Sequence, residues 1–122
     1  MLALSAPSNC FIEVGTLGGY STAWLACAAR SSGENGCGLV WTVERDKARA
    51  VFAEQNLAAA GLGPSVSVLN EPALEAIPKL CRTLQPKTAG LVFLDAQKSE
   101  YIAYFQQLED LVAPVRSNMP YV

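Results

Sequence analysis

Residues 10–21 read Cys10-Phe11-Ile12-Glu13-Val14-Gly15-Thr16-Leu17-Gly18-Gly19-Tyr20-Ser21. The first five are apolar apart from Glu13, a composition typical of a parallel strand covered on both faces. The glycines that follow allow a sharp turn and a close approach of the backbone to a ligand. An alanine-rich run then starts at Tyr20. The stretch therefore predicts a buried strand, a glycine turn and a helix whose N-terminus faces a ligand.

The same alternation continues along the chain. Apolar runs at 39–43, 66–69 and 91–95 predict three more strands, and helices are expected between them and after the last one. With right-handed crossovers, this order predicts an α/β fold, a Rossmann-like doubly wound parallel sheet with helices on both faces. We expect the strand order 3-2-1-4. The strand at 91–95 would then be an exposed apolar edge through which the chain could form a homo-oligomer.

Periodicity also assigns an inward side to the helices. Trp24, Trp41 and Phe93 are expected in the core, since large aromatic residues are mostly buried. For the helix capped by Asp46 and ended by Gly61, and for the last helix, the side chains expected to face inward are Ala48, Val51, Phe52 and Leu57, and Ile102, Phe105, Leu108 and Val112. Pro78 is expected to kink the helix at 72–84 or to end its first part.

Composition favours one domain spanning residues 1–122. Hydrophobic residues make up 51% of the chain, enough for a core. The net charge of -2, with scattered basic residues, gives no reason to expect nucleic acid or a membrane as partner. The cysteines at 10, 27, 37 and 81 form no CxxC pair, which predicts reduced, buried thiols in a cytoplasmic protein. The chain has no histidine, and this excludes Ser-His, Cys-His and histidine-metal chemistry.

The glycine turn first suggests a dinucleotide site, but its spacing differs from G-x-G-x-x-G because Leu17 replaces the second glycine. Glu13 would also repel a pyrophosphate, whereas it would favour a ligand carrying an ammonium or sulfonium charge. Glu44 and Asp95 follow the second and fourth strands, where ligands bind in open α/β sheets. These acids favour a cationic ligand, and the dinucleotide remains a less favoured alternative.

Three motifs in register resemble the S-adenosylmethionine-dependent, cation-dependent O-methyltransferases of the catechol and caffeoyl-CoA type. They are residues 13–21, the pair Val43-Glu44, and residues 93–101, and the resemblance extends from about Leu4 to Pro114. It implies a class I methyltransferase fold. It also implies S-adenosylmethionine as cofactor, Mg²⁺ or a similar divalent cation, and a small-molecule hydroxylated acceptor of the catechol kind.

The resemblance further implies roles for residues of the first motif. The methionine end of the cofactor would be shaped by the turn and held at the start of the helix. In this assignment Gly15, Thr16 and Gly19 shape the site with Glu13 beside them, and Tyr20 and Ser21 hold the cofactor carboxylate. The alternative for Glu13 is a solvated acid at a strand end.

The resemblance implies three more roles at the later strand ends. Glu44 would accept hydrogen bonds from the ribose hydroxyls, Asp95 would ligate the cation, and Lys98 would be the general base for the acceptor hydroxyl. A lysine base requires a pKa lowered by about 3 units from its reference value of about 10.4. The alternatives are a solvated acid for Glu44, a helix cap for Asp95 and an ordinary surface lysine for Lys98.

Against the family pattern, we expect the chain to be shortened at both ends. The helices that cover the cofactor have no counterpart before Leu2, and the Asp-Asn pair that completes the metal site is not reached by Val122. Glu71-Pro72 also replaces a glycine and a small or acidic residue near the adenine. The competing hypothesis is therefore a non-catalytic, degenerate α/β module that acts through association with itself or a partner.

Overall fold

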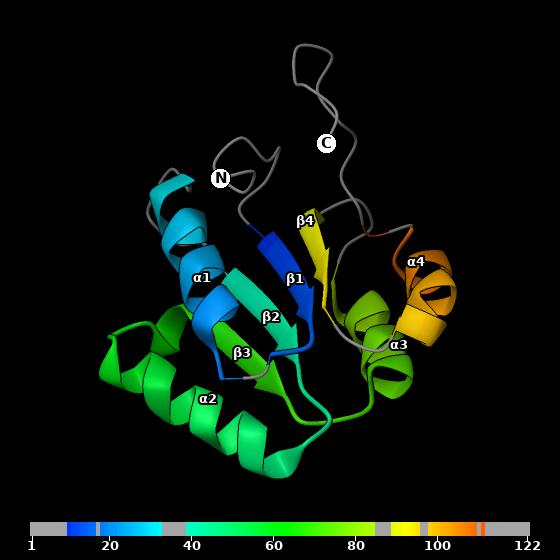
Figure 1. Ribbon diagram of the computed structural model, residues 1–122. Helices are drawn as coiled ribbons and strands as arrows, with labels where there is room; N and C mark the ends of the chain where they lie inside the picture. Colours follow the sequence, from blue (N-terminus) through cyan, green and yellow to red (C-terminus); the bar gives the residue numbers. More distant parts are fainter. Residues whose placement is uncertain are drawn as a thin grey trace.

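The chain forms a layer of strands between two layers of helices (Figure 1). The computed structural model describes residues 10–16, 18–32, 39–84, 89–95, 98–109 and 111. Helices α1 and α2 cover one face of the sheet, and α3 and α4 cover the other. The elements are β1 (Cys10–Val14), α1 (Tyr20–Ser32), β2 (Leu39–Val43), α2 (Lys47–Ala59), η2 (Gly63–Ser65), β3 (Val66–Leu69), α3 (Ala73–Thr83), β4 (Ala89–Leu94), η3 (Lys98–Glu100) and α4 (Tyr101–Leu108).

All strand pairs are parallel, and their order is β3-β2-β1-β4. The predicted fold class and strand order are confirmed. The strands also end level with one another, because Val14 of β1 lies opposite Val43 of β2 and Leu94 of β4. The residues that directly follow β1 and β4 extend this pairing. Gly15 N–H donates to Val43 O, and Asp95 N–H donates to Val14 O, both at 2.8 Å.

The two sides of the sheet bury different sets of side chains. Along β1, Ile12 and Val14 face the α3–α4 side, where they join an all-apolar cluster that includes Ile77. Phe11 packs on the α1–α2 side. Because side chains alternate along a strand, Glu13 shares the side of Phe11 and lies under α1. The single acid of β1 is thus directed into a helix–sheet interface.

Helix α2 begins and ends where predicted, but it packs on a different side. The Asp46 carboxylate accepts the Arg49 N–H at 2.9 Å, and Gly61 adopts the left-handed conformation, with φ 74°. The residues buried against the sheet are Ala50, Ala53 and Leu57, whereas Ala48, Val51 and Phe52 are exposed. The prediction is therefore correct only for Leu57. Small alanines let the helix approach the strands closely. Because alanine is only weakly hydrophobic, the periodicity of the sequence did not indicate that this side is buried.

For α4 the predicted inward side is confirmed only at Leu108 and is wrong for Ile102 and Phe105. Tyr104 and Leu108 are buried, whereas Ile102 and Phe105 are 76% and 67% exposed. Val112 lies outside the described residues. The buried side is the one that packs against α3 in the all-apolar cluster. Apolar residues occur all around this short helix, so its sequence alone does not define which side faces inward.

The aromatic residues expected in the core divide into two groups. Trp41 packs against the α3–α4 cluster and is partly buried. Trp24 is 55% exposed and Phe93 is 40% exposed, so for these two the core prediction is wrong. Phe93 lies on the edge strand, where only one neighbouring strand shields it.

Pro78 does not end a helix. Helix α3 is continuous from Ala73 to Thr83 with Pro78 inside it. Ala76 and Ile77 on one side of the proline and Leu80 on the other are all buried in the α3–α4 cluster. Burial on both sides of Pro78 stabilises the helix against the loss of one backbone hydrogen bond.

Strand β4 is the predicted edge strand, and the chain itself contacts both of its ends. Ala89 N–H donates to the carbonyl of Leu111 at 2.8 Å. The Tyr101 hydroxyl donates to the carbonyl of Leu94 at 3.1 Å. These bonds occupy backbone groups that could otherwise pair with another strand.

The cysteines within the described residues, Cys10, Cys27 and Cys81, form no disulfide. Cys27 is exposed, contrary to the prediction of buried thiols, while the other two are half-buried. Within the described part of the chain, no helix has the length and apolar character needed to cross a membrane.

Gly19 provides a test of the turn. Its φ is 87°, and an added Cβ would lie 3.3 Å from the Ala53 Cβ. We expect Gly19→Ala to lower the free energy of unfolding by about 1–2 kcal/mol, because a left-handed alanine is strained. Gly63→Ala is the matched control, since its added Cβ would meet only Ala58 Cα at 4.0 Å. Urea unfolding measures both, and equal stability of the two variants would contradict the assignment.

Candidate functional site

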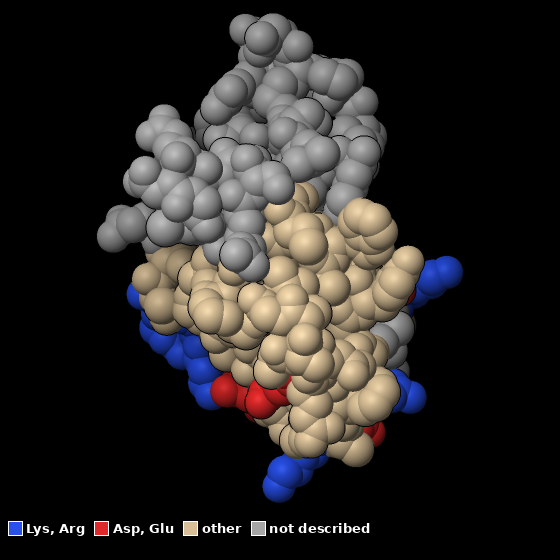
Figure 2. Space-filling model, turned by 90° about the vertical axis from the view of Figure 1, so that its left-hand side faces the viewer, with Lys and Arg blue, Asp and Glu red and all other residues tan. Residues whose placement is uncertain are grey.

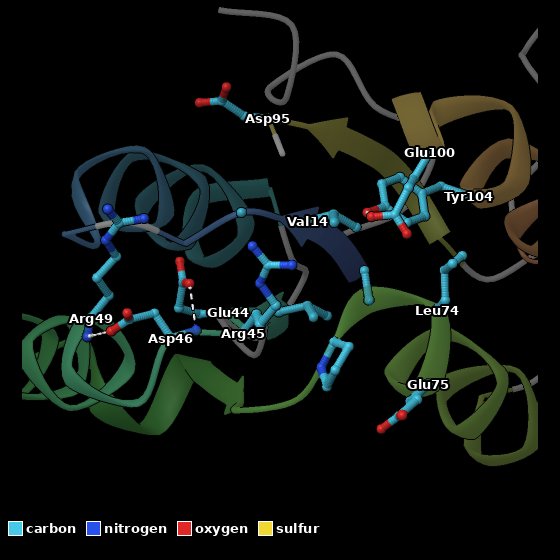
Figure 3. A pocket seen from close by; sticks show the side chains of 14 residues that line it. Val14, Glu44, Arg45, Asp46, Arg49, Leu74, Glu75, Asp95, Glu100 and Tyr104 are labelled. Carbon is cyan, nitrogen blue, oxygen red and sulfur yellow. Dashed lines mark hydrogen bonds between the residues drawn. The ribbon is translucent and has the colours of Figure 1, made fainter. Parts of the chain in front are cut away.

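A cavity of about 980 Å³ opens at the carboxyl ends of the strands (Figure 3). Its walls come from the ends of β1, β2 and β4, the start of α2, the start of α3, and the η3–α4 segment. Three of the predicted site residues line it together: Gly15, Glu44 and Asp95. Each is the first residue after its strand, so the level strand ends bring them to the same cavity.

Glu44 is a buried and hydrogen-bonded acid of this cavity. It is only 6% exposed, and its carboxylate accepts the Asp46 N–H at 2.9 Å. Its backbone N–H donates to Leu69 O, and its backbone carbonyl accepts the Asn70 Nδ2 group, both at 2.9 Å. Figure 3 places the carboxylate on the cavity side of the chain. Glu44 is thus a buried hydrogen-bond acceptor whose carboxylate is held at the end of β2.

Asn70 is a positioning residue that the sequence did not reveal. Its Nδ2 group donates to the carbonyls of both Glu44 and Arg45, at 2.9 and 3.1 Å, and so ties the end of β3 to the end of β2. Asn70 follows β3 just as Glu44 follows β2. This shared position at a strand end is the signal that could have identified it.

Asp95 and Lys98 are both exposed, but only Asp95 lines the cavity. In Figure 3 the Asp95 carboxylate lies on the β4 side, away from Glu44. Lys98 begins η3. The predicted metal ligand, Asp95, and the predicted base, Lys98, therefore lie apart from the predicted ribose acceptor, Glu44.

Two cavity residues, Glu100 in the last motif and Tyr104 just after it, were not predicted. Tyr104 is 2% exposed, and its hydroxyl donates to the Glu100 carboxylate at 3.0 Å. Burial, with the bond to Glu100 and its charge as further causes, raises the pKa of Tyr104 to about 12. The phenol therefore stays protonated at neutral pH and serves as a hydrogen-bond donor to Glu100.

The remaining predicted residues surround the glycine turn. Thr16 and Gly19 are buried within it, and Tyr20 is 78% exposed at the start of α1. Glu13 is 0% exposed, and Ser21 donates to its carboxylate at 2.5 Å. None of these five residues lines the cavity. Glu13 and Ser21 instead form part of a hydrogen-bond network beneath the turn.

The environment of Glu13 changes its protonation. Burial raises the pKa of its carboxyl group, and the Asp95 charge adds to this, whereas hydrogen bonds from Ser21, Thr22 and Thr42 act in the opposite direction. Burial is the largest of these effects. Burial under α1 therefore disfavours the charged form of this carboxyl group, and the hydroxyl donors reduce that effect.

The described residues do not form a metal centre by themselves. No group of three or more His, Cys, Asp or Glu side chains within the described ranges is placed to hold a metal ion. A hard cation such as Mg²⁺ requires six oxygen ligands in near-octahedral geometry. Asp95 alone does not supply this set.

A model of the O-methyltransferase family matches residues 1–116 of the chain. The chain belongs to this O-methyltransferase family. It is 39% identical over 106 residues to a catechol O-methyltransferase of Mycobacterium tuberculosis, covering 87% of this chain and 44% of that protein.

Solved structures of O-methyltransferases have the same fold. The O-methyltransferase TomG of Streptomyces achromogenes, in complex with S-adenosylmethionine, matches with a TM-score of 0.81 and 33% identity, over 93% of this chain and 48% of that one. A Bacillus cereus O-methyltransferase in complex with S-adenosylhomocysteine matches with a TM-score of 0.77 and 32% identity, over 91% and 47%. The chain thus spans less than half the length of these relatives. The predicted family and the Rossmann-like methyltransferase fold are confirmed.

The raised pKa of Glu13 predicts how its contribution to stability depends on pH. The folded state favours the protonated carboxyl group more than the unfolded state does, where the pKa is near 4.5. The free energy of unfolding of the wild type, compared with that of Glu13→Gln, should therefore be highest below pH 4.5. This difference should decrease as the pH rises through the folded-state pKa of Glu13. Urea unfolding of both proteins between pH 4 and 7 measures the difference. A wild-type advantage that grows with pH would contradict the assignment.

Proposed function

We propose that the chain binds S-adenosylmethionine in the cavity at the strand ends and acts in methyl transfer to a hydroxyl group of a small aromatic, catechol-like acceptor. The observation that carries the proposal is the buried Glu44 carboxylate, held by Asp46 N–H across from the glycine turn in a member of the O-methyltransferase family. Relatives with this fold bind S-adenosylmethionine or S-adenosylhomocysteine.

The cavity residues fit the adenosyl part of this cofactor. Two ribose hydroxyls need acceptors, and Glu44 has a carboxylate at the end of β2 with one oxygen bonded to Asp46 N–H. Gly15 leaves the backbone open to a ligand at the end of β1. When bound, the cofactor supplies a methyl group activated on a sulfonium sulfur. The start of α1, with Tyr20 and Ser21, is proposed to hold the cofactor carboxylate near the helix N-terminus.

For the transfer step, the acceptor hydroxyl must lose its proton as its oxygen attacks the methyl group. We assign this proton to Lys98 and the orientation of the acceptor to Asp95. Both side chains are exposed just beyond β4, and Asp95 also lines the cavity, so an acceptor at this edge of the cavity is accessible to both. A divalent cation would assist this step in the family, but the described residues do not form its site, and no step here depends on it.

Cofactor binding is tested through Glu44. We expect Glu44→Gln to weaken binding of S-adenosylhomocysteine by about tenfold or more, because hydrogen bonds to a charged acceptor contribute about 1.5–3 kcal/mol. Isothermal titration calorimetry measures the affinity. Glu54→Gln is the matched control, since Glu54 is an exposed residue of α2 that does not line the cavity. Equal affinity of Glu44→Gln and wild type would refute the assignment.

Catalysis is tested through Asp95 and Lys98. We expect Lys98→Met to lower methyl transfer to catechol by about 100-fold, as is typical for loss of a general base, with little change in cofactor affinity. Asp95→Asn should lower the rate by a similar factor of about 100, because the acceptor is no longer oriented. A radiolabelled methyl donor, assayed with Mg²⁺, measures the rate. Lys47→Met, an exposed lysine outside the cavity lining, serves as control. No transfer by the wild type at high enzyme concentration would contradict an active enzyme.

The second candidate function is association without catalysis. Three apolar side chains of the β4–α4 side, Phe93, Ile102 and Phe105, are exposed. Such residues can form an interface with another copy of the chain. Sedimentation distinguishes the two functions: a stable oligomer without affinity for S-adenosylhomocysteine would favour association, and a monomer that binds it would favour the methyltransferase.

A further inference from the structure

The buried Glu13 carboxylate connects the segments that surround the glycine turn. One of its oxygens, Oε1, accepts hydrogen bonds from the hydroxyls of Thr22 and Thr42, the latter at 2.7 Å. The other oxygen, Oε2, accepts the Ser21 hydroxyl at 2.5 Å. Thr22 and Ser21 belong to α1, and Thr42 belongs to β2. A single acid on β1 thus joins two neighbouring elements.

The network also includes Thr16 of the turn, and the direction of hydrogen-bond donation along it is defined. The Thr42 hydroxyl has one hydrogen, which it donates to Glu13. At the 2.6 Å contact between the two threonine hydroxyls, Thr16 must therefore be the donor. This relay runs from Thr16 through Thr42 to Glu13, and the exposed fractions of the three residues are 1%, 0% and 0%.

Helix α2 supports the turn from its other side. Asn56 Nδ2 donates to the carbonyl of Gly18 at 3.0 Å. Gly19 packs so closely on Ala53 that an added Cβ would lie 3.3 Å from the Ala53 Cβ. The turn is therefore held between α2 and the network centred on Glu13.

We propose that Glu13 is a positioning residue, which holds the turn and the start of α1 ready for the cofactor through the relay and does not itself contact the ligand. The inference rests on the proposed function. A different conformation of the turn would leave the buried Thr16 hydroxyl without its partner Thr42, and a shift of the start of α1 would remove the Ser21 and Thr22 donors from the carboxylate. Both losses are energetically costly. A site held in its binding conformation loses less entropy when the ligand binds. This differs from the direct contact with the cofactor that the sequence suggested.

Thr42→Val distinguishes a positioning role of Glu13 from direct contact with the ligand, because it keeps the Glu13 carboxyl group and removes its link to Thr16. We expect Thr42→Val to weaken S-adenosylhomocysteine binding by about tenfold in calorimetry. Thr42→Ser restores the hydroxyl and should bind like the wild type. Thr83→Val is the matched control, since the Thr83 hydroxyl bonds only to Lys79 O among the described residues, on the exposed side of α3. Hydrogen exchange of backbone amides at 15–22 should become faster in Thr42→Val alone.

A second comparison tests for direct contact with the ligand. We expect Glu13→Gln to weaken S-adenosylhomocysteine and its analogue without the amino group by the same factor. A loss limited to the ligand with the amino group would overturn the proposal, because Glu13 would then contact the ammonium. Wild-type affinity or unchanged hydrogen exchange in Thr42→Val would also overturn it. Failure of the wild type to bind S-adenosylhomocysteine would instead refute the proposed function, and the exchange measurement would still test the relay.

Discussion

The parallel register of β1 with its two neighbours is the constraint on which the site depends. Val14 lies opposite Val43 on one side and Leu94 on the other, so three strands end at the same level. The residues that follow them must therefore meet at one edge of the sheet. A shift of one residue in either pairing would move each strand's side chains to the opposite face of the sheet and bury the wrong set. The apolar cores on both faces thus fix the positions of the cavity residues.

The two faces of the sheet contribute differently to folding and to binding. The α3–α4 side is apolar throughout its buried cluster, and it anchors β1, β4 and both helices. The α1–α2 side combines an apolar cluster with a polar row, because Glu13 of β1 lies directly opposite Thr42 of β2. This polar row lies one residue before the strand ends. The hydrogen bonds that shape the turn are therefore placed next to the cavity, while the other face needs none.

The sequence predicted the sheet and the strand-end residues because both leave strong local signals. Each strand is a short apolar run, and Glu44 and Asp95 follow their runs directly. The buried faces of the helices were harder to predict, because small alanines pack against the sheet in α2 and apolar residues surround α4.

Within the site, spacing alone did not tell which side chains would face the cavity. Thr16 and Ser21 match a cofactor motif, yet their hydroxyls bond to Thr42 and Glu13. The alternation along β1, which puts Phe11 and Glu13 on one face, could have predicted that Glu13 points under α1. Asn70 follows its strand as Glu44 does, so its position could have identified it, whereas the place of Tyr104 in the cavity depends on segments far apart in the chain.

The charges around the cavity bear on the choice between a dinucleotide and a cationic cofactor. Among the described residues that line it, the acids outnumber the bases: Glu44, Asp46, Glu75, Asp95 and Glu100 against Arg45 and Arg49. A pyrophosphate would bring negative charge into this acidic site, whereas a sulfonium or an ammonium group would be attracted to it. Arg45 and Arg49 both follow β2, but the Arg45 side chain extends toward the middle of the cavity, where its charge acts on Tyr104 (Figure 3). The two bases thus offset only part of the negative charge of the five acids. An S-adenosylmethionine molecule whose ribose is bound by Glu44, as proposed, would therefore bring its sulfonium group into a site where acids outnumber bases, and this arrangement favours its positive charge.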